Sequence, residues 1–183
     1  MRLFLGIMFD DEIKNRIRPV LDMLSAEAVH GKATDPDNVH LTLIFLGDIE
    51  ESRLDEIKQA IDVDAYAFDL WIRDLGHFKS FRQGSTYYLG VEAVPDLLSL
   101  EAKLSDALHD KGFKVDRRTY HPHITIGRKI ELKDEDALTR LLDNAPSIRF
   151  RVDAFHLVKS TRTSKKPVYE SLMTVLLKDP DEA

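Results

Sequence analysis

The sequence predicts a mixed α+β fold in a single domain spanning residues 1–183. The chain is 43% hydrophobic, which is enough for one good apolar core, and no linker or low-complexity segment divides it. Strand-like and helix-like segments alternate, which by itself is compatible with parallel βαβ units. The last two strand-like segments resemble an antiparallel hairpin, so we expect antiparallel pairing as well, and the pattern leaves the topology open.

The N-terminal half begins with an apolar run at 2–9 that is typical of a buried strand. Aspartates at 10–11 supply a helix cap, and aliphatic residues then recur at helical spacing. Gly31 lies where we expect this helix to have just ended. The other elements expected in this half are a turn, a strand and a short helix, at 35–38, 39–46 and 52–61.

The C-terminal half contains two helical segments and five strand-like ones. Proline favours the first turn of a helix, so Pro95 opens a helix that we expect to reach Asp110 and to stop at Gly112. A second helix has leucines at helical spacing over 134–144. Hydrophobic and β-branched runs predict strands at 68–75, 85–93, 123–128, 148–160 and 169–178. We expect a loop containing His77 between the first two of these strands.

The composition excludes several classes of function. The chain has no cysteine, so it has no disulfide framework, thiolate metal site or cysteine nucleophile. It also lacks the glycine-rich phosphate-binding loops of nucleotide-binding proteins and the serine hydrolase motif. No signal-peptide pattern or membrane-length apolar run is present, so we expect a cytoplasmic protein with no membrane partner. Without a long exposed apolar stretch, we expect a monomer.

Charge is unevenly distributed along the chain. The net charge of −6 argues against non-specific binding of nucleic acid over the whole surface. The segment 159–166 nevertheless carries four basic residues and no acidic one. This basic segment is either a local site for RNA phosphates or a solvated loop, and the pattern favours neither. Four further basic residues extend the possible RNA-binding rim, namely Lys79, Arg82, Arg117 and Arg118.

Two segments in opposite halves of the chain share one pattern, HLTLIF and HITIGR, which begin at residues 40 and 123. Side chains at alternate strand positions point to the same face, so His40 and Thr42 share a face of their strand. By the same argument, His123 and Thr125 share a face of theirs. Threonine and aliphatic residues occur in many strands, so one such motif means little. The repetition of the motif favours a functional role.

The four side chains suit displacement at phosphorus. One histidine can take a proton from a nucleophile while the other gives a proton to a leaving group, and imidazole does both near neutral pH. Threonine hydroxyls can donate hydrogen bonds to the non-bridging oxygens of a phosphate. A strained cyclic phosphodiester is reactive enough to need no metal, so we expect neither a metal nor another cofactor.

This pair of motifs resembles that of the two-histidine phosphoesterase superfamily. The details resemble its RNA 2′,3′-cyclic phosphodiesterase branch, also named 2′-5′ RNA ligase. Supporting segments are RLFLGI near the N-terminus, LGHF at 75–78 and KS…PVYE at 159–170. The resemblance implies a bilobal α+β fold with two pseudo-symmetric lobes. Each lobe would have an antiparallel-rich sheet with helices outside, and the active site would lie in the central cleft.

The resemblance also implies roles for individual residues. His40 and His123 would be catalytic, with His40 the general acid toward the 3′ oxygen and His123 the general base that activates water. Thr42 and Thr125 would hold the phosphate. The product would be a 2′-phosphate, with weak 2′-5′ ligation as the reverse reaction. The sequence itself does not fix which histidine is the acid.

Phe45 and Arg128 lie five residues after the two histidines and occupy matching places in the motifs. The resemblance places them near the terminal base and phosphate, where a ring and a guanidinium can hold a base between them. An offset of five points away from the catalytic face of a regular strand. Gly127 can mark a bulge that corrects this, but bulky Ile44 gives no such signal. Alternatively, Phe45 is a core residue and Arg128 a surface charge.

Other interpretations stay open. A cyclic phosphate other than an RNA end, such as an ADP-ribose cyclic phosphate or a small cyclic nucleotide, would suit the same four side chains. A non-catalytic nucleotide-binding module on the same fold, or an interaction protein, is a further alternative. His121 and His123 have a spacing that can bind metal, but no third ligand stands at a convincing distance in the sequence. His77 is a candidate for substrate contact.

Overall fold

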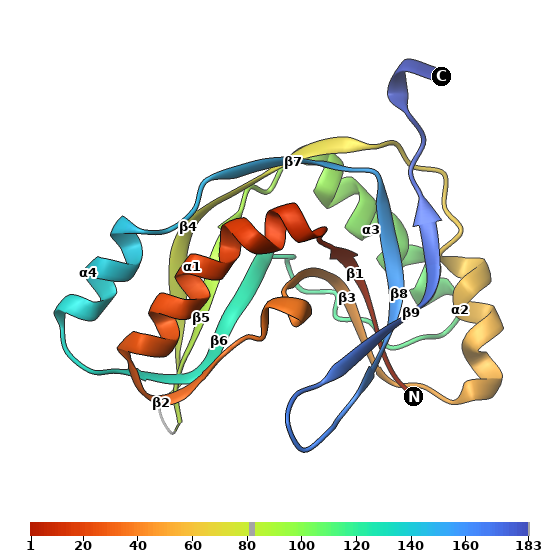
Figure 1. Cartoon of the computed structure of the whole chain (residues 1–183). Coiled ribbons are helices and arrows are strands. Elements are labelled where there is room, and N and C mark those ends of the chain that lie inside the picture. The colour runs from red at the N-terminus through yellow and green to blue at the C-terminus, as the bar shows by residue number, and fades with distance from the viewer. Residues whose placement is uncertain (81–82, 183) are drawn as a thin grey trace.

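The computed structural model of the protein describes residues 1–80 and 83–182. Its strands form two sheets, which meet where β3 lies beside β6 (Figure 1). The four-stranded sheet has the order β3 (His40–Asp48), β1 (Arg2–Met8), β8 (Ala154–Thr161) and β9 (Val168–Leu176). The five-stranded sheet has the order β2 (Ala28–Ala33), β6 (His123–Leu132), β5 (Gly84–Val91), β4 (Phe68–Ser80) and β7 (Ile148–Val152).

All pairings between these strands are antiparallel. The predicted α+β fold is therefore confirmed, and parallel βαβ units are absent from the described ranges. The two halves of the chain exchange strands between the sheets. β2, from the first half, joins the five-stranded sheet, whereas β8 and β9, from the end of the chain, join the four-stranded one.

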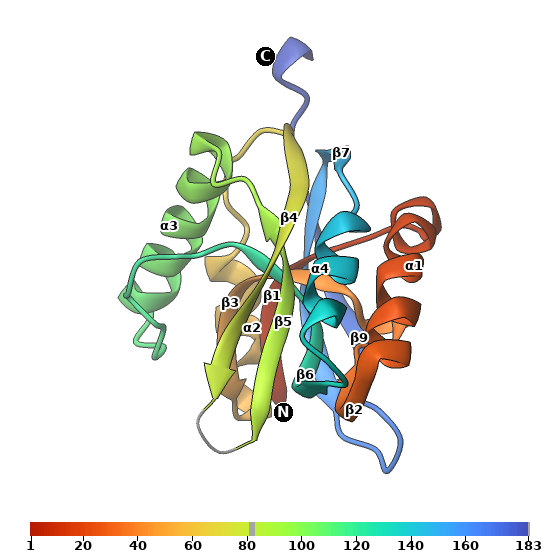
Figure 2. The same cartoon turned by 90° about the vertical axis from the view of Figure 1, so that its left-hand side faces the viewer.

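Helices cover the outer side of each sheet (Figure 2). α1 (Asp11–Glu27) and α4 (Asp136–Asp143) pack on the five-stranded sheet. α2 (Leu54–Ala60) and α3 (Pro95–Asp110) contact each other, and α3 packs against β3. Short 3₁₀ helices are η1 (Pro36–Asn38), η2 (Glu51–Arg53) and η3 (Pro180–Glu182). No helix in the described part of the chain is long and apolar enough to cross a membrane.

The helix ends follow local rules of capping. The Asp10 carboxylate accepts a hydrogen bond from the backbone N–H of Ile13 at 2.9 Å, which satisfies one free donor at the start of α1. Pro95 lies at the first positions of α3, as predicted. Buried residues from both sheets and from the helices form a single apolar cluster. This shared core fixes the two sheets relative to each other, and so fixes the strands that carry the paired motifs.

The expected end of the first helix was wrong. α1 ends at Glu27, and the next residues form the edge strand β2 rather than a longer helix. Gly31 lies within β2 with φ +89°, and a Cβ there would collide with the carbonyl group of Lys129 on the neighbouring strand. The glycine is required for this close approach and does not stop the helix.

Two further expectations were wrong because sequence periodicity shows neither where a strand ends nor which sheet it joins. β4 continues to Ser80, so His77 lies on a strand and not in a loop. The segment expected as one strand at 148–160 is two strands separated by Asp153. β7 pairs with β4 in one sheet, and β8 pairs with β1 in the other.

Candidate active site

The two histidine motifs lie on the strands at which the sheets meet. β3 begins with His40 and β6 begins with His123, and the two strands are in contact. A hydrogen bond also joins the motifs, because the hydroxyl of Tyr120 donates to the backbone oxygen of Thr42 at 2.8 Å. Tyr120 precedes β6, so this bond fixes the start of the second motif against the middle of the first.

A cavity of about 770 Å³ contains side chains of both motifs, and we call it the reaction cavity. It is lined by Thr42, Leu43, Ile44, Phe45, Phe78, Glu101, Asp116, Arg118, Thr119, Tyr120, His121 and His123. A hollow of this size with polar groups converging on a mainly apolar wall is typical of a binding site for a small ligand.

Both motif strands contain a β-bulge at the same place. Along β3, Ile44 pairs with Leu5 and Thr42 pairs with Gly6, so Leu43 is the extra residue. Along β6, Tyr87 and Tyr88 of β5 pair with Gly127 and Thr125, which leaves Ile126 as the extra residue. An extra residue shifts the alternation of side chains by one position.

The bulges bring the residues five places after each histidine to the exposed face. Two consecutive buried residues, Leu43 and Ile44, precede exposed Phe45, and buried Ile126 and Gly127 likewise precede exposed Arg128. The bulge predicted at Gly127 is confirmed. The equivalent bulge before Phe45 was missed, because no glycine marks it in the sequence.

His40 is held in one tautomer by its neighbours. Its Nδ1 lies 2.7 Å from the backbone oxygen of Asn38, which can only accept, so Nδ1 carries the proton. In the neutral ring Nε2 then accepts the hydroxyl hydrogen of Thr42 at 2.9 Å. Burial lowers the pKa of His40 below its ordinary value, and the positive charge of Arg128 lowers it further, against the opposing effect of the Asn38 hydrogen bond.

His123 has the same arrangement on the other strand. Its Nδ1 lies 2.7 Å from the backbone oxygen of His121, so Nδ1–H donates and Nε2 of the neutral ring carries the lone pair. Each histidine thus presents Nε2 as the reactive nitrogen. An imidazole whose Nδ1 is held by a carbonyl group keeps its tautomer and its orientation, which is what proton transfer at a fixed position requires.

Two aromatic rings pack against each histidine. Phe4 stacks on His40 with ring centres 4.7 Å apart, and Tyr169 meets it edge-on at 5.2 Å. Phe78 and Tyr88 lie edge-on to His123 at 5.6 and 5.5 Å. Sequence reasoning missed this role of all four rings. The RLFLGI and PVYE segments contain Phe4 and Tyr169, but only the strand pairing brings them to His40.

Thr125 is positioned by the segment that follows β2. The hydroxyl of Thr34 donates to the backbone oxygen of Thr125 at 3.1 Å, and the backbone N–H of Thr34 donates to the oxygen of Ile126 at 2.8 Å. These bonds hold β6 at its bulge. Thr125 is half-buried, as are His40, Thr42 and His123, so all four predicted side chains combine a fixed position with access to solvent.

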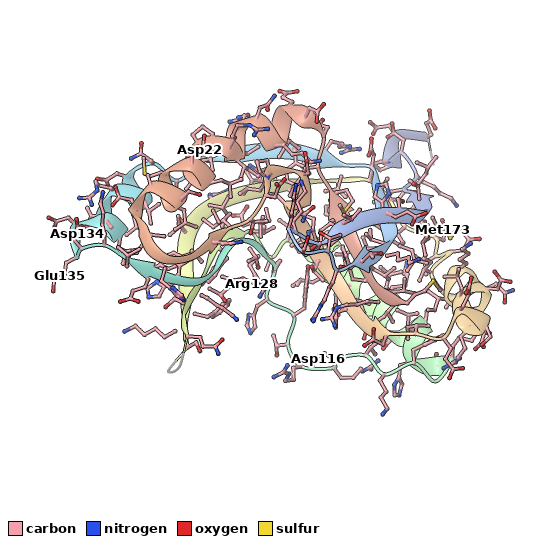
Figure 3. The ribbon with its side chains drawn as sticks, turned by 60° about the horizontal axis from the view of Figure 1, so that its bottom comes forward. Asp22, Asp116, Arg128, Asp134, Glu135 and Met173 are labelled. Atoms are coloured by element: carbon pink, nitrogen blue, oxygen red, sulfur yellow. The ribbon has the colours of Figure 1, made fainter. Side chains whose placement is uncertain are left out.

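Phe45 and Arg128 line different cavities. Phe45 is 50% exposed, which excludes a core role, and it lines the reaction cavity with the guanidinium of Arg2 4.8 Å from its ring centre. Arg128 lines a second cavity of about 950 Å³, which we call the basic cavity. Figure 3 labels Arg128 near the middle of the molecule and Asp116, of the reaction cavity, at its lower edge. Arg128 also lies close enough to His40 to affect its pKa.

The remaining candidates are less central. His77 stacks on buried Tyr87, with ring centres 5.2 Å apart. Adjacent residues of a strand point to opposite faces of the sheet, so Tyr87 and Tyr88 of β5 lie on different faces. His77 therefore lies on the face opposite to that of Tyr88 and His123. His121 is exposed and lines the reaction cavity. In the described ranges no group of three or more histidine, aspartate or glutamate side chains is placed to hold a metal ion.

The basic residues that were predicted to form an RNA-binding rim lie in separate parts of the structure. Arg118 is bound through its guanidinium to Asp116, and Arg117 forms an ion pair with Asp106 at 2.8 Å. Both arginines are therefore paired with acidic side chains, and of the two only Arg118 lines the reaction cavity. Lys79 is exposed near the end of β4. Arg82 lies outside the described residues.

Comparison with known proteins decides the family. A family model described as the 2′-5′ RNA ligase superfamily matches residues 9–164. The chain belongs to this superfamily. Curated superfamily relatives named RNA 2′,3′-cyclic phosphodiesterase, from Thermotoga maritima and Archaeoglobus fulgidus, are each 31% identical to it. The matches cover 94% of this chain and 93% and 98% of the two relatives.

Solved structures of similar proteins agree with the superfamily assignment. The crystal structure of E. coli LigT complexed with 3′-AMP is 25% identical and superposes with a TM-score of 0.78 over 96% of this chain and 97% of that one. The TT0787 protein of Thermus thermophilus superposes with a TM-score of 0.79 at 21% identity, over 98% of this chain and 100% of that one, and shows the shared fold. The two-histidine phosphoesterase fold is thereby confirmed.

Proposed function

We propose that the protein hydrolyses RNA 2′,3′-cyclic phosphate ends to 2′-phosphates without a metal ion. The observation that carries this proposal is the geometry of the histidine pair. Two half-buried imidazoles, each held through Nδ1 by a carbonyl oxygen, present Nε2 from adjoining strands, and each is accompanied by a threonine two residues later. The names of the superfamily relatives support the choice of substrate.

The proposed reaction is an in-line displacement at phosphorus. Nε2 of His123 takes a proton from water while the water oxygen attacks the phosphorus atom. The bond between phosphorus and the 3′ oxygen breaks, and Nε2–H of His40 gives its proton to that oxygen. The product carries a 2′-phosphate and a 3′-hydroxyl. The two histidines then exchange protons with solvent, and in the reverse direction they exchange roles, which allows weak 2′-5′ ligation.

The threonines hold the phosphate oxygens in this proposal. In the neutral state the Thr42 hydroxyl donates its hydrogen to His40. Protonation of His40 reverses that hydrogen bond, because Nε2 becomes a donor and the hydroxyl oxygen an acceptor. The hydroxyl hydrogen of Thr42 is then available to a non-bridging phosphate oxygen. Thr125, which occupies the equivalent position beside His123, binds the phosphate from the other strand.

The pH dependence tests the role of His40. A general acid must be protonated, so activity is lost as the pH rises through its pKa. In the free protein the pKa of His40 lies below its ordinary value of about 6.5, so the alkaline limb of kcat/KM should lie on the acidic side of that value. A bound phosphate anion favours the imidazolium form, so the alkaline limb of kcat should lie at higher pH than that of kcat/KM.

Single variants identify the limb that belongs to each histidine. His40→Gln should remove the alkaline limb and His123→Gln the acidic limb, as measured on a cyclic nucleotide over a range of pH. The reverse pattern would make His40 the base and His123 the acid, and would contradict the assignment made here.

The exposed ring of Phe45 is proposed as a platform for the terminal base. Stacking of a base on an aromatic ring is worth about 1–3 kcal/mol, so Phe45→Ala should raise KM for a 2′,3′-cyclic nucleotide about tenfold, with kcat little changed. Phe45→Trp should keep KM near the wild-type value, since it preserves the stacking face. Tyr66→Ala removes a similarly exposed ring outside the reaction cavity and serves as the control. An unchanged KM in Phe45→Ala would exclude the platform.

A substrate panel separates RNA ends from the alternative substrates. We expect an RNA ending in a 2′,3′-cyclic phosphate to have a higher kcat/KM than an ADP-ribose cyclic phosphate or a free cyclic nucleotide. The free nucleotide has the reacting ring but lacks the upstream chain. A higher kcat/KM for the ADP-ribose compound would overturn the substrate assignment and leave the two-histidine chemistry intact. Binding of nucleotides without turnover of any of these compounds would indicate a non-catalytic module.

A further inference from the structure

The two cavities beside the histidine pair differ in charge. The basic cavity lies between β2, the middle of β6 and the loop that joins β8 to β9. Its lining consists of Val29, His30, Gly31, Lys32, Ala33, Thr34, Asp35, Asn38, Arg128, Lys129, Lys165, Lys166, Pro167 and Tyr169. Five of these residues are cationic and one, Asp35, is acidic. The whole chain has a net charge of −6, but the basic cavity has a local excess of positive charge and therefore attracts anions.

Most of the positive charge in the basic cavity is not neutralised by the protein. Lys166 forms ion pairs with Asp35 at 2.9 Å and Asp37 at 3.1 Å. The other four cations form no ion pair with any residue that the structure describes. They are Lys32, Arg128, Lys129 and Lys165. All four are exposed to solvent.

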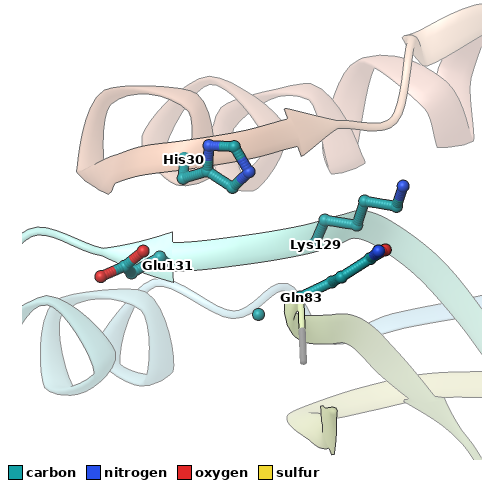
Figure 4. Close-up of a pocket in the computed structure, with 5 residues that line it drawn as sticks. His30, Gln83, Lys129 and Glu131 are labelled. Atoms are coloured by element: carbon teal, nitrogen blue, oxygen red, sulfur yellow. The ribbon is translucent and has the colours of Figure 1, made fainter. Parts of the chain in front are cut away.

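A smaller hollow adjoins the basic cavity. Figure 4 shows Lys129 and Gln83 on one side of this hollow, with His30 and Glu131 also on its wall. Lys129 lines both spaces, which are therefore neighbours across β6. The smaller hollow adds no cation beyond Lys129 and contains the carboxylate of Glu131, so the excess of positive charge is confined to the basic cavity.

The reaction cavity, unlike the basic cavity, has no excess of positive charge. Its charged lining residues are Glu101, Asp116 and Arg118, and the guanidinium of Arg118 is already bound to the carboxylate of Asp116. The remaining charge on this side is the carboxyl group of Glu101. A polyanion gains nothing by entering this cavity, whereas water, a hydroxyl group or a neutral base can occupy it without electrostatic cost.

The loop that joins β8 to β9, which we call the basic loop, is anchored to the segment that carries His40. The side-chain amide of buried Asn38 donates to the backbone oxygen of Pro167 at 2.8 Å, while the backbone oxygen of Asn38 accepts from His40. The ion pairs of Lys166 fix the same loop to the turn before Asn38. The loop is thereby held in place next to the catalytic strand, so its exposed Lys165 has a defined position relative to His40.

We propose that the RNA chain upstream of the reacting nucleotide lies in the basic cavity, with its phosphates against Lys32 and Lys165. This inference rests on the proposed function and assigns a direction to the substrate. The charged upstream chain leaves the histidine pair on the His40 side. The reaction cavity holds the reacting phosphate at Thr42 and the terminal base at Phe45, and it admits water or, in the reverse reaction, a 5′-hydroxyl. Exposed Val29 and half-buried Tyr169 give the path an apolar wall, as in sites for single-stranded nucleic acid.

The test compares two substrates in one double variant, Lys32→Gln/Lys165→Gln. The substrates are a short RNA oligonucleotide with a 2′,3′-cyclic phosphate end and the mononucleotide 2′,3′-cyclic AMP. At low salt, kcat/KM for the oligonucleotide should fall about tenfold relative to that for the mononucleotide, which has no upstream phosphate. Each lost contact to a single strand changes the slope of log K against log salt by about 0.7, so the slope for the oligonucleotide should become shallower by about 1.4.

The control removes the same charge elsewhere. Lys111→Gln/Lys114→Gln alters two exposed lysines after α3 that line neither of the two cavities, and it should leave the ratio between the substrates unchanged. An equal loss with both substrates in the Lys32/Lys165 variant, or an equal effect in the control, would overturn the inference. If the wild-type protein opens the mononucleotide, such a result refutes the RNA path alone. If it opens neither substrate, the proposed function fails and the path fails with it.

Discussion

His40→Ala and His123→Ala should each lower the rate of cyclic-phosphate opening by a factor on the order of 10² to 10⁴, the usual contribution of general acid–base catalysis. Each variant removes the imidazole Nε2 that its strand presents to the substrate. A water molecule can replace an imidazole at the site but lacks its matched pKa and its fixed position. The measurement is kcat on an RNA with a 2′,3′-cyclic phosphate end.

Two further variants complete this experiment, namely the double variant that lacks both His40 and His123 and a control variant of a third histidine. Because the two histidines act in one step, removing both should cost little more than removing either, and the losses should not multiply. His156→Ala removes a half-buried histidine from β8 and should keep most of the activity, since His156 bonds to Ser171 and lines neither cavity. Retention of near-wild-type rates by either single variant would contradict the assigned chemistry.

Thr42→Val and Thr125→Val are expected to have the next largest effect, a loss on the order of 10²-fold in kcat. Valine has nearly the same shape as threonine but cannot donate a hydrogen bond, so the change removes one donor to the phosphate. Thr42→Val also deprives Nε2 of His40 of its hydrogen-bond partner, which is 2.9 Å away in the free protein. This variant should therefore also shift the His40 limb of the pH profile, whereas Thr125→Val should not.

Serine variants provide the control for the threonine pair. Thr42→Ser and Thr125→Ser keep the hydroxyl and lose only a methyl group, so both should retain most of the wild-type kcat. If valine and serine at one position reduce kcat equally, the loss arises from packing on the strand. In that case the proposed hydrogen bond to the phosphate does not exist.

The paired motifs could be found from the sequence because the information is local. Strand periodicity places His and Thr on one face, and the repetition of the motif distinguishes function from ordinary strand composition. The two ends of α3 could be predicted for the same reason, because Pro95 is a local signal for the start of a helix and Gly112 is one for its end. The bulge at Gly127 was predictable because glycine is a local signal, whereas the equivalent bulge at Leu43 has no such residue.

The missed features depend on contacts between residues far apart in the sequence. β2 is an edge strand whose side chains are mostly exposed, so it shows no hydrophobic alternation and the sequence predicts no strand there. The aromatic rings around His40 come from β1 and β9, near opposite ends of the chain. The basic cavity needs β2, β6 and the loop after β8 together, so neither its charge nor its position could be predicted from any one segment.

The most direct test of the central claim is a single-turnover assay in EDTA with a short RNA that ends in a 2′,3′-cyclic phosphate. We expect full conversion to an RNA with a 2′-phosphate and a 3′-hydroxyl, at a rate that the chelator does not affect and that is lost in both histidine variants. A requirement for added metal, or conversion that survives the loss of both His40 and His123, would contradict it.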